Sequence, residues 1–251
     1  MRIATWNVNS MNARFPRVEE FLQTRDVDVV LLQETKQRDE KFPFDALREM
    51  GYESAHFGLS QWNGVAILSR VGLEDVVQGF GEPEEEARVI AATCGGVRVY
   101  SCYIPNGRAL DNPHYEYKLR WLESLHGRLA TYDPAMPLVV GGDFNVTPTD
   151  FDCYDVSAFV GATHVSEPER EALRRIESLG LVDITRQLNP DEPCYSWWDY
   201  RNGCFRRGWG LRIDLLYCSA PVVATASASW IDREARKGEK PSDHAPVLVD
   251  F

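Results

Sequence analysis

The chain lacks several features that would assign it to a class at once. None of its apolar runs approaches the ~20 residues that a membrane-spanning helix needs. Its first residues do not place basic side chains before an apolar stretch, so no secretory signal is expected. No short repeat, low-complexity tract or Gly/Ser linker interrupts the sequence. These absences predict one domain over residues 1–251 with no membrane contact.

Cysteine patterns typical of zinc sites are also missing. The six cysteines form no CxxC pair, and no histidine lies at zinc-ligand spacing from any of them. Cys94, Cys102 and Cys218 fall in apolar or alternating segments, where small buried hydrophobic residues are expected. Cysteines of this kind indicate a reducing compartment, and we expect a cytoplasmic protein.

An excess of positive charge is absent. The chain has 27 Lys and Arg against 38 Asp and Glu, a net charge of −11. This balance argues against binding nucleic acid over the whole surface. A local basic groove is still compatible with it, because salt screens surface charges beyond about 10 Å. The stretch from Trp197 to Arg212 is net positive, whereas the acidic residues at 82–86 predict a solvated loop without chemistry.

Strand and helix patterns alternate along the chain. Gly95 and Gly96 predict a hairpin, Ser166 a helix N-cap and Gly180 a helix stop. The mixture of buried strands, hairpins and helices indicates a layered α/β sandwich. Strands are expected at 2–6, 28–32, 65–68, 89–94, 97–103, 137–140, 211–218, 222–230 and 247–251, and helices at 14–24, 115–129 and 167–179.

Polar side chains stand at the ends of several apolar strands. A carboxylate beside a buried strand costs several kcal/mol unless it is paired or metal-bound. Five separate sites of this kind predict groups that converge on a cleft at one edge of the sheets. They are Asn7, Glu34, Asp143 with Asn145, Asp214, and Asp243 with His244.

The chemistry of these residues is coherent. Asn7 and Glu34 offer the oxygen ligands that Mg²⁺ prefers. Asp143 could act as a base, Asn145 could orient a water, and His244 could donate to a developing anion. No Ser or Cys is placed as an obvious nucleophile, so water is the expected attacker. Acidic groups would repel an anionic substrate without a cation, which favours metal-assisted phosphodiester hydrolysis.

Each residue also has a purely structural interpretation. Asn7 could cap a strand end, Glu34 could face solvent, and His244 could be a satisfied core histidine. Asp214 could form a buried pair with Arg212, which strand alternation places on the same face. These interpretations would all have to hold independently, and their coincidence favours a site.

Eight segments in order along the chain resemble the exonuclease III family of abasic-site endonucleases, within the endonuclease/exonuclease/phosphatase superfamily. The resemblance implies an α/β fold, a four-layered α/β sandwich with two packed mixed β-sheets flanked by helices. The segments are WNVNS (6–10), LQETK (32–36), NGVAILSR (63–70), YIPNG (103–107), GDFNVTPTD (142–150), SWWDYR (196–201), LRIDLLYCS (211–219) and PSDHAPVLVDF (241–251).

The resemblance also implies a function. It implies a Mg²⁺-dependent DNA repair nuclease, with Mn²⁺ as a substitute, that cuts the backbone 5′ to abasic sites and trims 3′ ends of duplex DNA. The expected partner is double-stranded DNA with abasic sites or 3′ ends, and the expected state is a monomer. The alternative is a phosphatase of the same superfamily acting on a phosphorylated small molecule or lipid head group.

Residue roles follow from the resemblance in two groups, and the first group surrounds the reacting phosphate. Asn7 and Glu34 match the metal-binding pair, and Tyr103 matches the tyrosine that contacts the scissile phosphate. Asp143 matches the aspartate assigned to water activation, and Asn145 the asparagine that positions the water or phosphate.

The second group lies around the leaving group and the histidine. Asp214 matches the aspartate placed near the leaving group. His244 matches the histidine that stabilises the pentacovalent phosphate, with Asp243 supporting it. Trp197 matches an aromatic residue near the abasic pocket, and Asn9 aligns with a position that is Asp in some relatives.

Arginines alternate with aromatic residues between 197 and 212, as in segments that grip phosphates and stack on bases. Alternation would bury Trp198 if Trp197 faces outward. The loop at 206–210 departs most from the family pattern. The expected DNA contacts are Trp197, Arg201, Arg206, Arg207 and Arg212.

Overall fold

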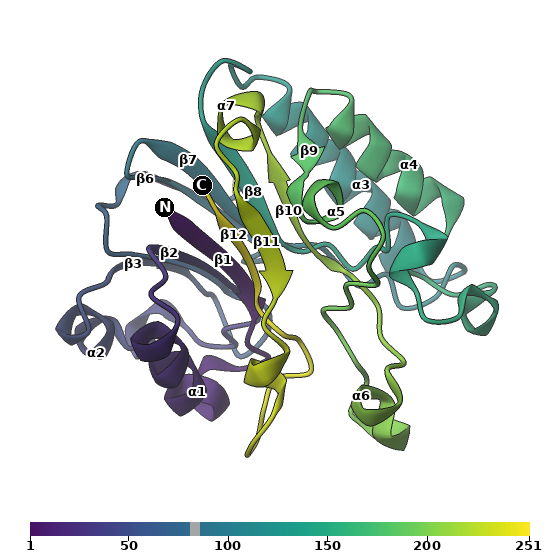
Figure 1. Cartoon of the computed structure of the whole chain (residues 1–251), viewed down its shortest axis with the longest axis horizontal. Helices are drawn as coiled ribbons and strands as arrows, with labels where there is room; N and C mark the ends of the chain where they lie inside the picture. The colour runs from purple at the N-terminus through teal and green to yellow at the C-terminus, as the bar shows by residue number, and fades with distance from the viewer. Residues whose placement is uncertain (81–85) are drawn as a thin grey trace.

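Two six-stranded β-sheets packed face to face form the centre of the structure (Figure 1). It is a computed structural model that describes residues 1–80 and 86–251. Helices cover the outer face of each sheet, so the molecule has four layers. The predicted four-layered α/β sandwich is confirmed.

The first sheet has the strand order β11-β12-β1-β2-β4-β3. Only β1 and β2 run parallel, and the other neighbours are antiparallel. The strands are β1 (Arg2–Asn7), β2 (Val29–Gln33), β3 (Glu53–Phe57), β4 (Val65–Ser69), β11 (Ala228–Ile231) and β12 (Val247–Asp250).

The second sheet has the order β5-β6-β7-β8-β10-β9, with β7 and β8 as its parallel pair. The predicted hairpin joins β6 to β7 through Gly95 and Gly96, both with positive φ. The strands are β5 (Glu74–Gln78), β6 (Val89–Cys94), β7 (Val97–Tyr103), β8 (Leu138–Asp143), β9 (Val182–Asp183) and β10 (Asp214–Cys218).

Helices flank the two sheets on opposite sides, as Figure 1 shows for α1 and α3. Phe21 and Leu22 of α1 pack on the first sheet, and Trp121 and Leu125 of α3 pack on the second. The helices are α1 (Met11–Thr24), α2 (Phe44–Glu49), α3 (Pro113–Leu129), α4 (Glu167–Glu177) and the short α5 (Ile184–Leu188), α6 (Cys204–Arg207) and α7 (Ala220–Val223). Single 3₁₀ turns lie at 39–41, 150–152, 156–159, 201–203 and 233–236.

Strand β2 illustrates why the sequence forms central strands. Val29 and Leu31 point into the core between the sheets, and Val30 and Leu32 point to the core under α1. All four side chains are fully buried. A strand covered on both faces must be apolar at every position, which is the continuous run seen in the sequence.

Several predicted boundaries are confirmed and two are wrong. Ser166 forms a capping box with Glu169, and Gly180 has a φ of 85° after α4. The predicted strand at 222–230 is wrong in its first half, because α7 occupies 220–223 with Pro221 in its first turn, where proline is favourable. The strand predicted from Leu211 begins only at Asp214.

Cysteines and the acidic run can now be placed. All six cysteines are free, and Cys94, Cys102 and Cys218 are buried, as predicted. Within residues 1–80 and 86–251, no helix has both the length and the apolar character of a membrane span. Positions 82, 84 and 85 of the acidic run lie outside the described residues, whereas Glu86 forms an ion pair with Arg88 rather than facing solvent alone.

Arg212 corrects two predictions. Its side chain is fully buried, so it cannot contact DNA. Its partner is not Asp214: Nε donates to Asp152 Oδ1 at 2.7 Å, and Nη1 lies 2.7 Å from Asp183 Oδ2. Arg186 adds a second arginine to Asp152 at 2.6 Å. Arg212 therefore ties three segments of the fold together.

We predict that Arg212→Ala lowers the free energy of unfolding by about 3–5 kcal/mol, because it leaves buried carboxylates without their partner. Arg206→Ala, at an exposed site, should change it by less than about 0.5 kcal/mol. Urea unfolding followed by tryptophan fluorescence measures both. Equal stability of the two variants would contradict a structural role for Arg212.

Candidate active site

The polar strand ends meet at one edge of the sandwich. β1, β2, β7 and β8 finish at this edge, and β10 and β12 start there because they run antiparallel to β8 and β1. In β8 and β10, Asp143 pairs directly with Asp214. The residues brought to this edge are Asn7, Glu34, Tyr103, Asp143, Asp214 and His244.

The centre of this group consists of Asn7, Glu34, Asp143 and His244. These four residues and Asp214 are called the acidic cluster below. Asn7 Nδ2 donates to Glu34 Oε1 at 2.8 Å and to Asp143 Oδ2 at 2.9 Å. Ligand atoms of Glu34, Asp143 and His244 all lie within 4.8 Å of one another. Side chains more than 200 positions apart in sequence thus share one site.

His244 is held by Asp214, not by its sequence neighbour. Its Nδ1 lies 2.8 Å from Asp214 Oδ2, and its Nε2 faces Asp143 Oδ2 at 3.8 Å. Ser196 Oγ donates to the same Asp214 oxygen at 2.7 Å. The expectation that Asp243 supports the imidazole is therefore wrong, because consecutive residues of an extended segment point their side chains in different directions.

Asp243 instead organises the rim of the site. Its Oδ1 accepts from Asn9 Nδ2 at 2.9 Å, and its Oδ2 accepts from Trp197 Nε1 at 3.1 Å. Asn9 also accepts a hydrogen bond from Lys36 Nζ through its Oδ1. This places the half-buried Trp197 and the basic Lys36 on either side of one carboxylate.

Burial and crowding of like charges set the protonation of the cluster. Burial, with Asp214 and Glu34 nearby, raises the pKa of Asp143 to about 7, although His244 opposes the shift. Burial would lower the pKa of His244, but Asp214 and Asp143 outweigh it and raise that pKa to about 10. His244 is therefore an imidazolium at neutral pH and can donate from Nε2.

The donor set fits a divalent cation. Two carboxylates, Glu34 and Asp143, converge there, and Asp214 adds a third beside the single imidazole of His244. Carboxylate oxygens suit Mg²⁺ and Mn²⁺, whereas a protonated His244 has no free lone pair to offer. The residues that would hold the ion are therefore Glu34 and Asp143.

The Asn7 side chain bridges the two carboxylates. Its Oδ1 accepts from the backbone N–H of Asn9 at 2.9 Å, and its Nδ2 faces the two carboxylates. It therefore acts as a donor that holds Glu34 and Asp143 together. Lys36 Nζ pairs with the other Glu34 oxygen at 2.8 Å, so both oxygens of Glu34 have partners.

Tyr103 and Asn145 complete the expected set. Burial raises the pKa of Tyr103 well above its usual range, so its phenol stays protonated and can donate. The Arg88 guanidinium lies 4.8 Å from the centre of the Tyr103 ring. Asn145 has a φ of 52°; its N–H donates to Asp143 Oδ1 at 2.9 Å, and its Oδ1 accepts from Asn106 Nδ2 at 3.1 Å.

A buried ion pair that was not predicted lies behind Asn145. Lys118 and Glu169 are fully buried and bonded to each other, and Lys118 Nζ donates to the Asn145 carbonyl at 2.6 Å. His164 also bonds that carbonyl through Nδ1 at 2.6 Å and has a φ of 79°. One signal was present: Lys118 lies at an apolar position of the α3 periodicity, between Tyr115 and Leu122.

A surface next to the site was missed as well. We call it the basic groove; Lys36, Arg38, Lys41 and Trp62 line it. Trp62 is 67% exposed and also lines a second hollow that contains Tyr103 and other residues of the site. The groove and this hollow share Ser60 and Trp62, and Lys36 of the groove pairs with Glu34 of the acidic cluster.

The stretch predicted to contact DNA is only partly available. Arg206 and Arg207 are exposed, and Arg207 lies over the Trp209 ring at 4.6 Å. Arg201 is exposed but paired with Asp199. Trp198 is fully buried, as alternation predicts.

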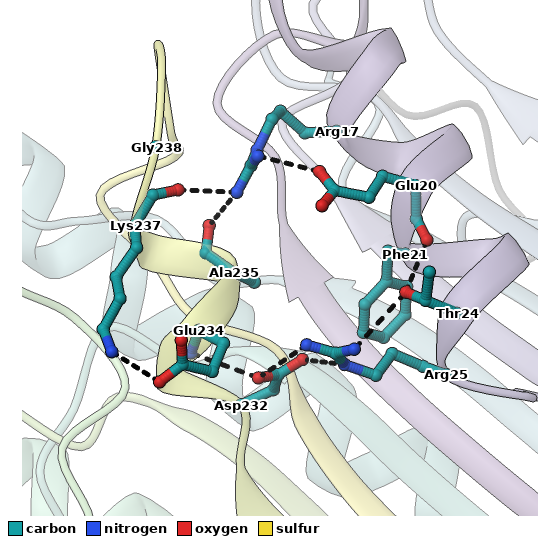
Figure 2. Close-up of a pocket in the computed structure, with 10 residues that line it drawn as sticks. All are labelled: Arg17, Glu20, Phe21, Thr24, Arg25, Asp232, Glu234, Ala235, Lys237 and Gly238. Carbon is teal, nitrogen blue, oxygen red and sulfur yellow. Dashed lines mark hydrogen bonds and ion pairs between the residues drawn. The ribbon is translucent and has the colours of Figure 1, made fainter.

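Another hollow lies between α1 and the segment that precedes β12 (Figure 2). Its charged side chains pair with one another: Arg25 with Asp232 at 2.6 Å, and Lys237 with Glu234 at 2.6 Å. Arg17 donates to the carbonyl oxygens of Ala235 and Lys237. These contacts fasten α1 to the C-terminal segment.

Comparisons with known proteins agree with this geometry. A sequence model of the endonuclease/exonuclease/phosphatase family matches residues 4–244. The exodeoxyribonuclease III of Haemophilus influenzae is 31% identical over the full length of both chains, and the exodeoxyribonuclease of Bacillus subtilis is 31% identical over 98% of each.

Solved structures are similar over the whole chain. The 3′-5′ exonuclease NExo from Neisseria meningitidis has a TM-score of 0.97 at 42% identity, covering 100% of this chain and 99% of that one. NExo is also described as a 3′ phosphatase, in a structure bound to a product DNA hairpin, with a TM-score of 0.98 at 41% identity and the same coverage. An AP endonuclease from Archaeoglobus fulgidus has a TM-score of 0.97 at 37% identity, again with the same coverage.

We predict that, in EDTA, Asp143→Asn raises the free energy of unfolding at about pH 8 by about 1–3 kcal/mol. The folded chain keeps a proton on Asp143 up to about pH 7 that the unfolded chain has already lost, so raising the pH destabilises the wild type. The advantage of the variant should shrink toward about pH 4. Urea unfolding at both pH values checks this, and a pH-independent difference between the two proteins would contradict it.

Proposed function

The chain belongs to the endonuclease/exonuclease/phosphatase family and is a hydrolase of the exodeoxyribonuclease III type, and we propose that it uses Mg²⁺, or Mn²⁺ in its place, to hydrolyse duplex DNA at 3′ ends and 5′ to abasic sites. The observation that carries the proposal is the convergence of Glu34 and Asp143 beside a protonated His244. Such a site combines cation ligands, a base and a proton donor within one cleft.

In this mechanism water attacks phosphorus, the phosphate–oxygen ester bond breaks, and the leaving oxygen takes a proton from solvent water. Asp143 accepts the proton of the attacking water. His244 Nε2–H and the Tyr103 hydroxyl donate to the charged phosphate oxygens. A cation held by Glu34 and Asp143 would supply further positive charge at those oxygens.

Asp214 and Asn145 act indirectly, by positioning the side chains that act on the phosphate or on the attacking water. Asp214 is fully buried behind His244, so we assign it to orienting the imidazole rather than to protonating the leaving group. Asn145 positions the base, because its N–H holds one oxygen of Asp143. Lys118 and His164 hold the Asn145 carbonyl and support this arrangement from behind.

DNA is the substrate that suits the surface around the cluster. The basic groove offers cations for phosphates and the exposed Trp62 for stacking, and Arg206 and Arg207 are exposed on α6. A small phosphorylated molecule would not need such an extended track. All the residues of the cluster come from one chain, which supports action as a monomer.

We predict that Asp143→Asn and His244→Asn each lower turnover by about 10²–10³, because each removes a group needed mainly in the transition state. Binding of a labelled duplex in EDTA should stay within a few-fold of wild type. Arg120→Ala, on the outer side of α3, is the matched surface control. Near-normal cleavage by either site variant would refute its assigned role.

The two proposed activities separate on one gel. The substrate is an end-labelled duplex with one abasic analogue, incubated with Mg²⁺ or with EDTA. Internal incision gives a single short product, and end trimming gives a ladder from the 3′ side. Loss of both with EDTA is expected. Cleavage that persists in EDTA, or activity confined to a soluble inositol phosphate, would overturn the proposal.

We predict that Arg38→Ala combined with Lys41→Ala weakens duplex binding and reduces the slope of log K against log salt by about 1–2, since each lost phosphate contact removes about 0.9 from that slope. Trp62→Ala should weaken binding with little change in the slope, because stacking releases no counterions. Fluorescence anisotropy over a salt series measures both. An unchanged slope in the double variant would exclude the basic groove from the DNA path.

A further inference from the structure

The loop that carries Glu34 has a strained backbone. Glu34 and Lys36 have φ values of 51° and 52°, in the left-handed region that residues other than glycine seldom adopt. Each such residue is unfavourable unless the surrounding structure holds it in place. Thr35 lies between them and is fully buried. Contacts to Thr35 must therefore keep this loop, and with it the Glu34 carboxylate, in place.

The backbone of the loop is fixed by a neighbouring turn. Thr35 N–H donates to the Gly64 carbonyl at 3.1 Å, and Lys36 N–H donates to the Asn63 carbonyl at 2.9 Å. A Cβ on Gly64 would lie 2.1 Å from Thr35 Oγ1, so only glycine permits this approach. Backbone contacts alone leave the Thr35 hydroxyl to be satisfied.

That hydroxyl belongs to a chain of three side chains. Thr35 Oγ1 lies 2.8 Å from His56 Nε2, and His56 Nδ1 lies 2.7 Å from Asp39 Oδ1. The Asp39 carboxylate can only accept, so Nδ1 carries the proton. Burial lowers the pKa of His56 to about 4, so the ring is neutral and Nε2 accepts from the Thr35 hydroxyl.

The chain is anchored at its far end. His56 stacks on Phe42 with ring centres 4.1 Å apart and an interplanar angle of 13°. Asp39 Oδ1 also accepts from Gly58 N–H at 2.7 Å. The order of the three groups is that of a nucleophile, a base and an acid, but the full burial of Thr35 keeps substrate from its hydroxyl. Its role is therefore to hold the loop.

We propose that the Thr35–His56–Asp39 chain positions the Glu34 carboxylate for a divalent cation, an inference that rests on the proposed metal-dependent function. Thr35, His56 and Asp39 are positioning residues that touch neither substrate nor metal. Without the Thr35 hydroxyl bond, the left-handed loop loses the side-chain contact between its two strained residues. Glu34 then samples positions away from Asp143, and cation affinity falls.

The test measures Mn²⁺ binding to EDTA-stripped, desalted protein by titration calorimetry, without DNA. Thr35→Val removes the hydroxyl at nearly constant volume and should weaken Mn²⁺ binding by about 10-fold or more, as loss of an outer-shell partner typically does. Thr35→Ser keeps the hydroxyl and should stay within about 2-fold of wild type. Thr185→Val is the matched control, because Thr185 is also fully buried and bonds Ser229 Oγ at 2.9 Å in another part of the fold.

Two substitutions of His56 separate its hydrogen bond with Thr35 from its hydrogen bond with Asp39. His56→Gln can present an amide oxygen near Nε2 and keep the bond from Thr35, so it should retain most of the affinity. His56→Asn can donate to Asp39 from near Nδ1 but cannot reach Thr35, so it should bind Mn²⁺ as weakly as Thr35→Val. This pair also carries the test if Thr35→Val fails to fold.

The outcomes distinguish failure of the proposed positioning chain from failure of the proposed metal site. Weaker binding in Thr35→Val and His56→Asn, with near-native binding in the Ser, Gln and Thr185→Val variants, supports the positioning chain. Wild-type affinity in folded Thr35→Val, with only a lower melting temperature, overturns it and leaves the proposed function intact. Absence of Mn²⁺ binding by the wild type overturns the proposed metal site itself.

Discussion

Burial of like charges at one edge of the sandwich is the constraint on which the rest of this structure depends. Glu34, Asp143 and Asp214 meet there with one imidazolium and one ammonium nearby. Each carboxylate is expensive to bury alone, so each receives its own donors: Asn7 for two of them, and Ser196 with His244 for Asp214. The remaining excess of negative charge is what a divalent cation would neutralise. If protein groups neutralised the carboxylates completely, the site would have little attraction for a cation.

Sheet geometry explains how such a cluster can form. Each sheet has one parallel pair at its centre, and their carboxyl ends meet the amino ends of antiparallel strands at a single edge. The strands are rigid because both faces are covered, and the ligand-bearing residues follow them immediately. Short loops must then turn sharply to aim their side chains inward. Glu34 and Asn145 do this with positive φ, and the strain is held by hydrogen bonds from buried partners.

Burial and strand topology could be predicted from the sequence, whereas the partners of individual side chains could not. The central strands and the convergence of Asn7, Glu34, Asp143 and His244 were predictable, because periodicity and motif order report burial and topology. Strands β3, β5 and β9 were not predicted. The partner of His244 was not predictable: Asp243 and Asp214 are both aspartates, and only the direction of side chains in three dimensions selects Asp214. The same holds for Arg212, whose partners come from two distant segments. No sequence pattern indicated a role for His56, because its hydrogen-bond partners Thr35 and Asp39 reach its two ring nitrogens only in the folded chain.

Charge is also distributed unevenly over the surface. This distribution explains how a chain with a net negative charge can bind DNA. A net charge of −11 spread over the whole surface would keep DNA away. Lys36, Arg38 and Lys41 are concentrated beside the acidic cluster instead, within the distance over which local charges dominate at physiological salt. Lys36 belongs to both zones, because it pairs with Glu34 and also lines the basic groove. A phosphate that drew Lys36 toward the groove would free one oxygen of Glu34 for a cation. Lys36 therefore links the basic groove to a carboxylate that we propose as a cation ligand.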